Sequence, residues 1–231
     1  MSKSKRHPWR LCPLGKHWVT PHMRTRTSSR GHSYTQSVEG HCRSNSSQLD
    51  HLYTDEIHEI AARYFSKLKG LPNVTIKEFG TNGNQYDSLI RGWTCYLNEV
   101  LSPAEPLDPD IIKALIATES GFRPAEWNHR RGSSAAYGLM QVLGNTVRLL
   151  KSSDELRDHL VNLDEDDMLD PNLSICAGIR WLFRKKQILE ARAGKKVSWR
   201  DAIAAYKGVK PNETKLMPRF DKILKELKGT K

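Results

Sequence analysis

The sequence predicts a mainly α-helical fold that follows a basic, loop-rich N-terminal segment. Two observations support this prediction. Apolar residues recur at helical spacing through most of the chain after residue 54. Residues 1–50 instead show no sustained hydrophobic period and are rich in Ser, Thr, Arg and His. No apolar run in the sequence approaches the length of a membrane span, so a membrane-spanning class is excluded.

The positive charge of the chain is concentrated at its N-terminus. Residues 1–50 carry nine Lys or Arg against two acidic residues, which is +7 of the formal net charge of +11. We expect a segment of residues 1–50, a helical N-terminal part of the domain over 51–106 and its remainder over 107–231. Nucleic acid, an anionic membrane surface and an anionic cell-wall polymer all fit this sign of charge.

The first predicted helix starts at Thr54, a candidate N-cap, and its first turn holds Asp55 and Glu56. Gly70 and Pro72 end it. The elements expected after it are a short extended piece over residues 74–79 and a second helix over residues 85–100.

The third helix is predicted to begin with Asp108 as its cap and Pro109 at its first position. Its apolar residues recur at helical spacing, so most of this helix should be buried. The helices expected after it cover residues 145–150, 173–189, 199–206 and 215–227.

The most informative stretch is residues 114–141, in which ALIATESGFRP leads through a polar loop into AYGLMQ. Glu119 ends the buried helix and should therefore emerge from an apolar wall. A carboxyl group in such a place is harder to ionise and holds a proton nearer to neutral pH. A general acid needs this property, so Glu119 is the candidate catalytic residue.

The motifs in this stretch resemble those of the soluble lytic transglycosylase catalytic domain, a lysozyme-like family. The resemblance covers roughly residues 107–206 and rests on Glu-Ser-x-Phe-x-Pro from Glu119, Ala-x-Gly-Leu-Met-Gln up to Gln141, and the late Ala-Ala-Tyr that ends at Tyr206. It implies a lysozyme-like helical fold, with residues 107–231 as the catalytic domain. It also implies cleavage of peptidoglycan glycan strands.

The resemblance implies a single-carboxylate mechanism. Glu119 would protonate the glycosidic oxygen that leaves N-acetylmuramic acid, and would then take the proton of that sugar's 6-hydroxyl, giving a 1,6-anhydro end. Met140, Gln141 and Tyr206 would contact substrate. The structural alternatives are an ordinary exposed glutamate for Glu119, a turn with a helix start for Met140 and Gln141, and a core aromatic for Tyr206.

Several positions depart from the family pattern. Lys207 replaces the usual Asn after the tyrosine, and Ser174 replaces an Asn after Asp-Pro. Gly132 falls where a serine is often found, with Ser133 and Ser134 beside it, in a loop that is unusually basic over residues 129–131. The choice between anhydro product and hydrolysis therefore stays open. The candidate second carboxylates for a hydrolase are Glu126, Asp164, Glu165, Asp166 and Asp167.

The N-terminal segment contains residue types that bind metals. Cys12, His17, His22 and Cys42 are candidate ligands of a structural zinc, although their spacing is not that of a standard zinc finger. A disordered basic arm that meets an anionic partner is the alternative. Cys95 and Cys176 are expected to be small buried residues, and the sequence gives no sign of an obligatory small-molecule cofactor.

The N-terminus carries no apolar core of a secretory signal peptide, so we expect delivery to the periplasm or cell wall by a non-classical route. The expected partners are peptidoglycan glycan strands and, for an exported effector, a secretion-system component or an immunity protein. A phage-associated lysin is the other expected origin. A different class, a non-catalytic module that binds glycan or nucleic acid on a lysozyme-like scaffold, stays open.

Overall fold

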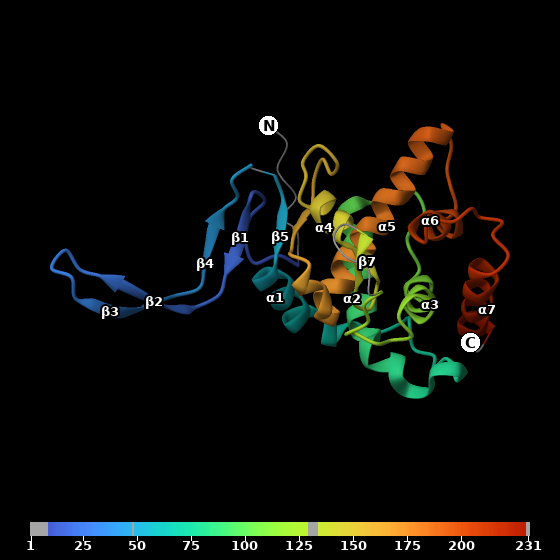
Figure 1. The fold of residues 1–231 in the computed structure, drawn as a ribbon, viewed down its shortest axis with the longest axis horizontal. Coiled ribbons are helices and arrows are strands. Elements are labelled where there is room, and N and C mark those ends of the chain that lie inside the picture. The colour runs from blue at the N-terminus through green and yellow to red at the C-terminus, as the bar shows by residue number, and fades with distance from the viewer. Residues whose placement is uncertain (1–8, 48, 129–133, 230–231) are drawn as a thin grey trace.

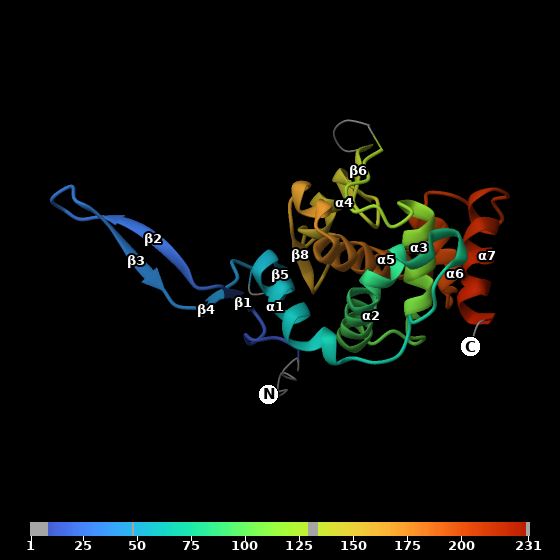
Figure 2. The same cartoon turned by 90° about the horizontal axis from the view of Figure 1, so that it is seen from below.

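The computed structural model describes residues 9–47, 49–128 and 134–229, which form a helical body and a β segment that projects from one side of it (Figure 1). The body confirms the predicted mainly α fold. Its long helix α5 (Pro171–Ala193) lies in the middle, and the other helices surround it (Figure 2). No helix in the described ranges is long and apolar enough to cross a membrane.

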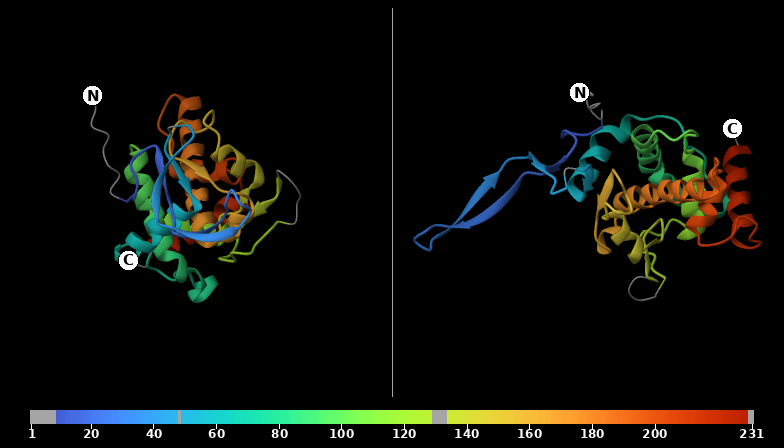
Figure 3. Two further views of the ribbon diagram at one scale, coloured as in Figure 1. Left: turned by 90° about the vertical axis from the view of Figure 1, so that its left-hand side faces the viewer. Right: turned by 90° about the horizontal axis from the view of Figure 1, so that it is seen from above.

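The N-terminal segment is built of β-hairpins. Strand β1 (Lys16–Val19) pairs antiparallel with β4 (His41–Ser44), and β2 (His22–Thr27) pairs antiparallel with β3 (Ser33–Val38). The outer pair reaches far from the body (Figure 3). A loop-rich segment was expected because a ribbon exposed on both faces needs no apolar alternation, the signal by which strands are recognised.

Two of the predicted zinc ligands form a disulfide, because the structure joins Cys12 to Cys42. Zinc binds thiolates, so this bond removes both sulfurs from the predicted ligand set. His17 Nδ1 lies 2.7 Å from the Asn45 side-chain oxygen, and His22 lies exposed on β2. In the part of the chain that the structure describes, no three His, Cys, Asp or Glu side chains are grouped to hold a metal. The two cysteines are therefore corrected as ligands, and zinc binding by this segment stays a prediction.

A short parallel strand pair joins the first and second halves of the body. Strand β5 (His51–Tyr53) pairs with β8 (Leu160–Asn162), and helix α1 (Thr54–Tyr64) follows β5 directly. Thr54 was predicted to cap this helix, but it is the first helical residue and no side chain caps the start. The 3₁₀ turn η1 (Phe65–Lys67) ends the helix.

The remaining helices agree with their predicted positions within a few residues. The extended piece expected at 74–79 is wrong: the 3₁₀ segment η2 (Lys77–Tyr86) occupies part of it, bent at Gly80. The other elements are α2 (Asp87–Leu101), α3 (Pro109–Glu119), β6 (Ala136–Tyr137), β7 (Val142–Leu143), α4 (Gly144–Leu150), η4 (Asp166–Leu169), α6 (Trp199–Tyr206) and α7 (Leu216–Gly229).

Helix α5 is the centre of the hydrophobic core. It packs against α1, α2, α4 and α6, while α3 packs between α2 and α7. Cys176 on α5 is fully buried, as expected, whereas Cys95 on α2 is half-buried. Since α1 and α2 contribute to the same core as α3 and α5, residues 51–106 are part of the helical body.

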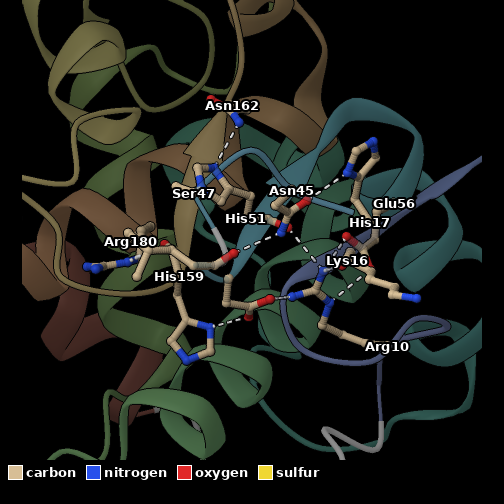
Figure 4. A network of polar contacts seen from close by, with 12 residues as sticks. Arg10, Lys16, His17, Asn45, Ser47, His51, Glu56, His159, Asn162 and Arg180 are labelled. Carbon is tan, nitrogen blue, oxygen red and sulfur yellow. Dashed lines mark hydrogen bonds and ion pairs between the residues drawn. The ribbon is translucent and has the colours of Figure 1, made fainter. Parts of the chain in front are cut away.

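A buried arginine attaches the N-terminal segment to the body (Figure 4). The Arg10 guanidinium contacts the carboxylates of Asp50 and Glu56 and donates to the carbonyls of Lys16 and His51. His159 Nδ1 lies 2.8 Å from the second Asp50 oxygen. These groups are buried, so each charge must be compensated by the groups that contact it.

Burial sets the protonation of this network. It lowers the pKa of His159 to about 4, so the imidazole is neutral near pH 7. Burial also raises the pKa of Glu56, and the neighbouring Arg10 opposes that rise. Arg10 therefore favours the ionised form of Glu56 in the folded state.

Replacing Arg10 with Met is expected to lower the free energy of unfolding by about 3 to 5 kcal/mol at pH 7, because it leaves two buried carboxylates without their cation. The deficit relative to wild type should shrink from pH 7 to pH 5, since Glu56 then takes up a proton in the folded variant. Urea unfolding at both pH values measures this. Arg63→Met, which breaks an exposed helix pair, is the control and should change stability by about 0.5 kcal/mol or less. An equal deficit at both pH values would contradict the electrostatic account.

Candidate active site

Glu119 is the last residue of helix α3. The Asp108 side chain accepts a hydrogen bond from the Asp110 amide at the other end of this helix, as predicted, and Pro109 occupies its first position. Ile112, Leu115 and Ile116 are completely buried, whereas the Glu119 side chain is 19 % exposed. The helix thus delivers one carboxylate from the core to the edge of solvent.

The turn after Glu119 explains the Gly-Phe of the first motif. Gly121 and Phe122 both have positive φ, at 60° and 64°. Phe122 is an unusual residue to hold that conformation, and its ring is buried against Gly83, where a Cβ would lie 2.6 Å from it. Phe79 packs edge-on against the same ring. Apolar packing therefore holds the strained turn next to the carboxylate.

The first and second motifs are joined by a hydrogen bond. The Ser120 hydroxyl donates to the Leu139 carbonyl at 2.9 Å, and both residues are buried. A buried hydroxyl without a partner would be costly, so this bond fixes the relative position of the two segments. The serine of Glu-Ser-x-Phe thus holds the Gly-Leu-Met-Gln turn beside Glu119.

The second motif is a tight turn pressed against α5 and its preceding segment. Gly138 has φ 72°, and a Cβ there would lie 1.8 Å from the Met168 carbonyl oxygen. The Met140 amide donates to the Ser174 hydroxyl at 3.2 Å. Ser174, which stands where the family has Asn, therefore receives the backbone of the turn. The glycine is required by close approach as well as by its conformation.

Met140 was predicted to contact substrate, and the structure corrects this. Its side chain is completely buried and packs on Gly178, where a Cβ would lie 2.6 Å from it. The contribution of Met140 to the site is its backbone carbonyl. Gln141 is half-buried, and its side-chain amide donates to the carbonyls of Glu126 and Gly138, both at 3.0 Å.

Tyr206 lies where the third motif meets the second. Its hydroxyl donates to the Met140 carbonyl at 2.8 Å. Burial raises the pKa of Tyr206 well above its ordinary value, and the negative charge of Glu119 raises it further. The phenol therefore stays protonated, which keeps it a hydrogen-bond donor. Tyr206 and Glu119 therefore lie within electrostatic reach of each other.

Lys207 also reaches the site, and this was not anticipated. Its ammonium nitrogen lies 2.7 Å from Glu119 Oε1, and its side chain is only 4 % exposed. The sequence showed Lys207 as a departure from the family's Asn but did not reveal its contact. The available signal was its place directly after Tyr206, at the end of the same helix.

Four of the five candidate second carboxylates contact groups other than Glu119. Glu126 pairs with Arg123 at 2.6 Å, and Asp164 pairs with Lys151 at 2.5 Å. Glu165 accepts a hydrogen bond from the Tyr137 hydroxyl at 3.2 Å. Asp167 accepts one from the Asp164 amide. The basic stretch 129–131, Gly132 and Ser133 lie outside the described residues, whereas the Ser134 carbonyl accepts from the Asn128 amide.

A comparison with protein families finds one that spans this site. The model described as Transglycosylase SLT domain matches residues 99–216, slightly more than half of the chain. The match includes the carboxylate at the end of α3, the turn against α5 and the end of α6. No curated protein and no solved structure matches the chain.

Replacing Gly138 with Ala tests how closely the turn packs. The new Cβ would meet backbone at 1.8 Å, so we expect the free energy of unfolding to fall by about 3 kcal/mol or more. Gly194→Ala is the matched control, because Gly194 also has positive φ, at 63°, but has open space around it. That control should cost about 1 to 2 kcal/mol, the conformational cost alone. Urea unfolding of both variants measures the difference, and equal losses would show that Gly138 is not sterically required.

Proposed function

The chain belongs to the transglycosylase SLT family, and from this premise we propose that it cleaves the β-1,4 bond between N-acetylmuramic acid and N-acetylglucosamine in peptidoglycan. Membership of the family supports peptidoglycan lytic transglycosylase activity in general. The observation that carries the finer proposal is the position of Glu119. It is a partly buried carboxylate at the point where the three motifs meet.

Glu119 acts first as general acid in this proposal. Its proton passes to the glycosidic oxygen while the bond from that oxygen to the anomeric carbon of N-acetylmuramic acid breaks. The N-acetylglucosamine hydroxyl leaves, and positive charge develops on the muramic acid ring. The Glu119 carboxylate that results lies next to this charge and stabilises it.

The same residue then acts as base. The 6-hydroxyl of N-acetylmuramic acid attacks the anomeric carbon and gives its proton to Glu119, which returns to its starting form. The product is a 1,6-anhydro ring, and no water is consumed. One carboxylate therefore suffices, whereas glycosidases that use water commonly need two.

The neighbouring groups support this role by shaping the site. The Tyr206 hydroxyl is bound to the Met140 carbonyl, so we assign it to holding the turn beside Glu119. The side-chain amide nitrogen of Gln141 is bound to two backbone carbonyls. Its amide oxygen is proposed to accept hydrogen bonds from the N-acetyl groups of the sugars.

The disulfide between Cys12 and Cys42 supports a destination outside the reducing cytoplasm, because such bonds persist in oxidising compartments. The periplasm and the cell wall meet this condition and contain peptidoglycan. Delivery by a specialised secretion system or release by a phage remains part of the proposal. So does an immunity protein that protects a producing cell.

Mass spectrometry of purified peptidoglycan digested by wild type and by Glu119→Gln tests the proposal. Wild type should release anhydro-muropeptides, and the variant should lose at least about a thousandfold in rate, because the amide neither donates the proton nor accepts it. Glu59→Gln, which changes an exposed carboxylate on α1, is the matched control and should retain full activity. A melting curve confirms that each variant is folded.

Two other outcomes would replace the proposal. Reducing-end products that vanish in Glu119→Gln would identify a muramidase, and Glu126→Gln and Glu165→Gln would then locate its second carboxylate. Products that do not depend on Glu119 would assign the acid/base role to another residue. No products from folded wild type would leave a non-catalytic module that binds glycan or nucleic acid.

A further inference from the structure

Lys207 is a buried lysine whose ammonium touches the proposed acid/base. It follows the last residue of α6, and the Lys207 amide donates to the Ile203 carbonyl there, so the backbone is fixed. The side chain reaches Glu119 at 2.7 Å with 4 % of its surface exposed. A buried ammonium requires a compensating charge, and Glu119 supplies it.

The pair bears on both halves of the reaction. In the acid step Glu119 must point its carboxyl group at the glycosidic oxygen, and in the base step it must point the same group at the 6-hydroxyl. The Lys207 ammonium lies 2.7 Å from Glu119 Oε1 and so fixes one oxygen of that group. The Asn of the family carries no charge, so it would hold the carboxyl group less firmly.

We propose that Lys207 is a positioning residue that orients the Glu119 carboxyl group for proton transfer. This inference rests on the proposed function. The proton that moves passes between Glu119 and the sugar oxygens. Lys207 acts through Glu119 and needs no contact with substrate.

The groups around Glu119 permit this assignment. From α6 it faces Lys207 and the phenol of Tyr206, which stays protonated because its pKa is raised. The turn at residues 138–141 is tied to the residue after Glu119 by the hydrogen bond from the Ser120 hydroxyl to the Leu139 carbonyl. The ion pairs that α3 makes with α2 and α7, Lys113 with Asp87 and Asp108 with Lys228, lie nearer its other end.

Steady-state rates of Lys207→Asn and Lys207→Arg test the role. Lys207→Asn should lower kcat at least about tenfold with KM nearly unchanged, because the carboxyl group loses the contact that orients it. Lys207→Arg keeps the charge and should keep most of the wild-type kcat. Lys210→Asn, which removes an exposed lysine just after the helix, is the matched control and should change nothing.

Crystal structures of wild type and of Lys207→Asn give a readout that does not depend on turnover. The Glu119 carboxyl group should occupy one orientation in wild type and more than one in Lys207→Asn. That difference without Glu119-dependent products would overturn the proposed function and leave the positioning role standing. A folded Lys207→Asn with an unchanged kcat and an unchanged Glu119 orientation would overturn the role of Lys207.

A separate observation concerns the ribbon formed by β2 and β3. Every residue of β2 is exposed, and all of β3 is exposed except Val38. The ribbon projects from the body in Figures 1 and 2 and in the right panel of Figure 3. A lone two-stranded hairpin is at best marginally stable, and this one buries no core, so its surface is available for contact with a partner.

The strand register sorts this ribbon into two unlike faces. Residues directly opposite each other share a face, and successive residues alternate. The basic face consists of His22, Arg24, Arg26, Tyr34, Gln36 and Val38. The hydroxyl face consists of Met23, Thr25, Thr27, Ser33, Thr35 and Ser37. The basic face carries no acidic residue, and both arginines lie in adjacent pairs with Tyr34 or Gln36.

The base of the ribbon is fixed to the body. Thr20, just before β2, donates to Asp55 at the start of α1 through its amide at 3.1 Å and its hydroxyl at 2.9 Å. The pairing of β1 with β4 and the Cys12–Cys42 disulfide secure the same region. The ribbon is thus anchored at the domain that carries Glu119.

We infer that the basic face of the ribbon binds peptidoglycan through the carboxylates of its stem peptides. Guanidinium groups bind carboxylates in pairs of parallel hydrogen bonds, and an aromatic ring stacks on sugar or peptide. This inference also rests on the proposed function, since the substrate of the domain supplies the anionic groups. It is independent of Lys207.

Co-sedimentation with insoluble peptidoglycan tests the inference in a Glu119→Gln background, in which the polymer is not digested. Arg24→Gln with Arg26→Gln should weaken binding at least about tenfold, and wild-type binding should fall as salt rises. Thr25→Ala with Thr35→Ala changes the hydroxyl face of the same ribbon and is the matched control. It should bind as before.

Equal binding by the arginine and threonine variants would overturn the inference. So would tighter, arginine-dependent binding to duplex DNA than to peptidoglycan, which would identify a nucleic-acid surface. The arginine variant with Glu119 intact should still cleave short soluble glycan fragments, because cleavage of such fragments does not require the ribbon. This assay separates failure of the ribbon inference from failure of the proposed function.

Discussion

The close packing of the turn at residues 138–141 against α5 is the constraint on which the site depends. Gly138 lies against the Met168 carbonyl, and Met140 lies against Gly178. Neither contact leaves room for a Cβ on the glycine. In this position the turn presents the Leu139 and Met140 carbonyls to the interior of the protein. One accepts from Ser120, next to Glu119, and the other accepts from Tyr206. The second motif thereby positions both the first and the third.

Two buried cations serve different ends in this molecule. Arg10 neutralises Asp50 and Glu56 and attaches the N-terminal segment to the body. Lys207 pairs with the one carboxylate that the proposed reaction requires to change its protonation. Both pairs are shielded from water. Opposite charges interact more strongly in such an environment than at the surface. The first pair is accordingly structural, while the second couples the fold to the chemistry of the site.

Much of the helical body was predictable because its helices carry local signals. The cap at Asp108, the proline after it and the apolar period of α3 lie within a few residues of each other. The contacts of the site were less accessible. The sequence motif predicts that Met140 lines the site. Only its contact with Gly178, which is distant in the sequence, shows that the Met140 side chain belongs to the hydrophobic core. The Lys207 contact spans 88 positions in sequence, so no local pattern encodes it.

The N-terminal segment was predicted least well. Its ribbon has no buried face, so no hydrophobic alternation marks its strands. Cys12 and Cys42 are 30 residues apart, and a spacing of that size does not distinguish a disulfide from a metal site. Only the folded hairpins, which bring β1 and β4 together, decide between them.

The central claim is that three motifs converge to place Glu119 against the bond that is cleaved. A crystal structure of the Glu119→Gln protein with a bound glycan tetrasaccharide tests it most directly. The account predicts a glycosidic oxygen about 2.6 to 3.2 Å from the side chain at position 119, with the Tyr206–Met140 hydrogen bond intact. A glycan that binds elsewhere, or one that reaches this site only after the turn has left α5, would contradict it.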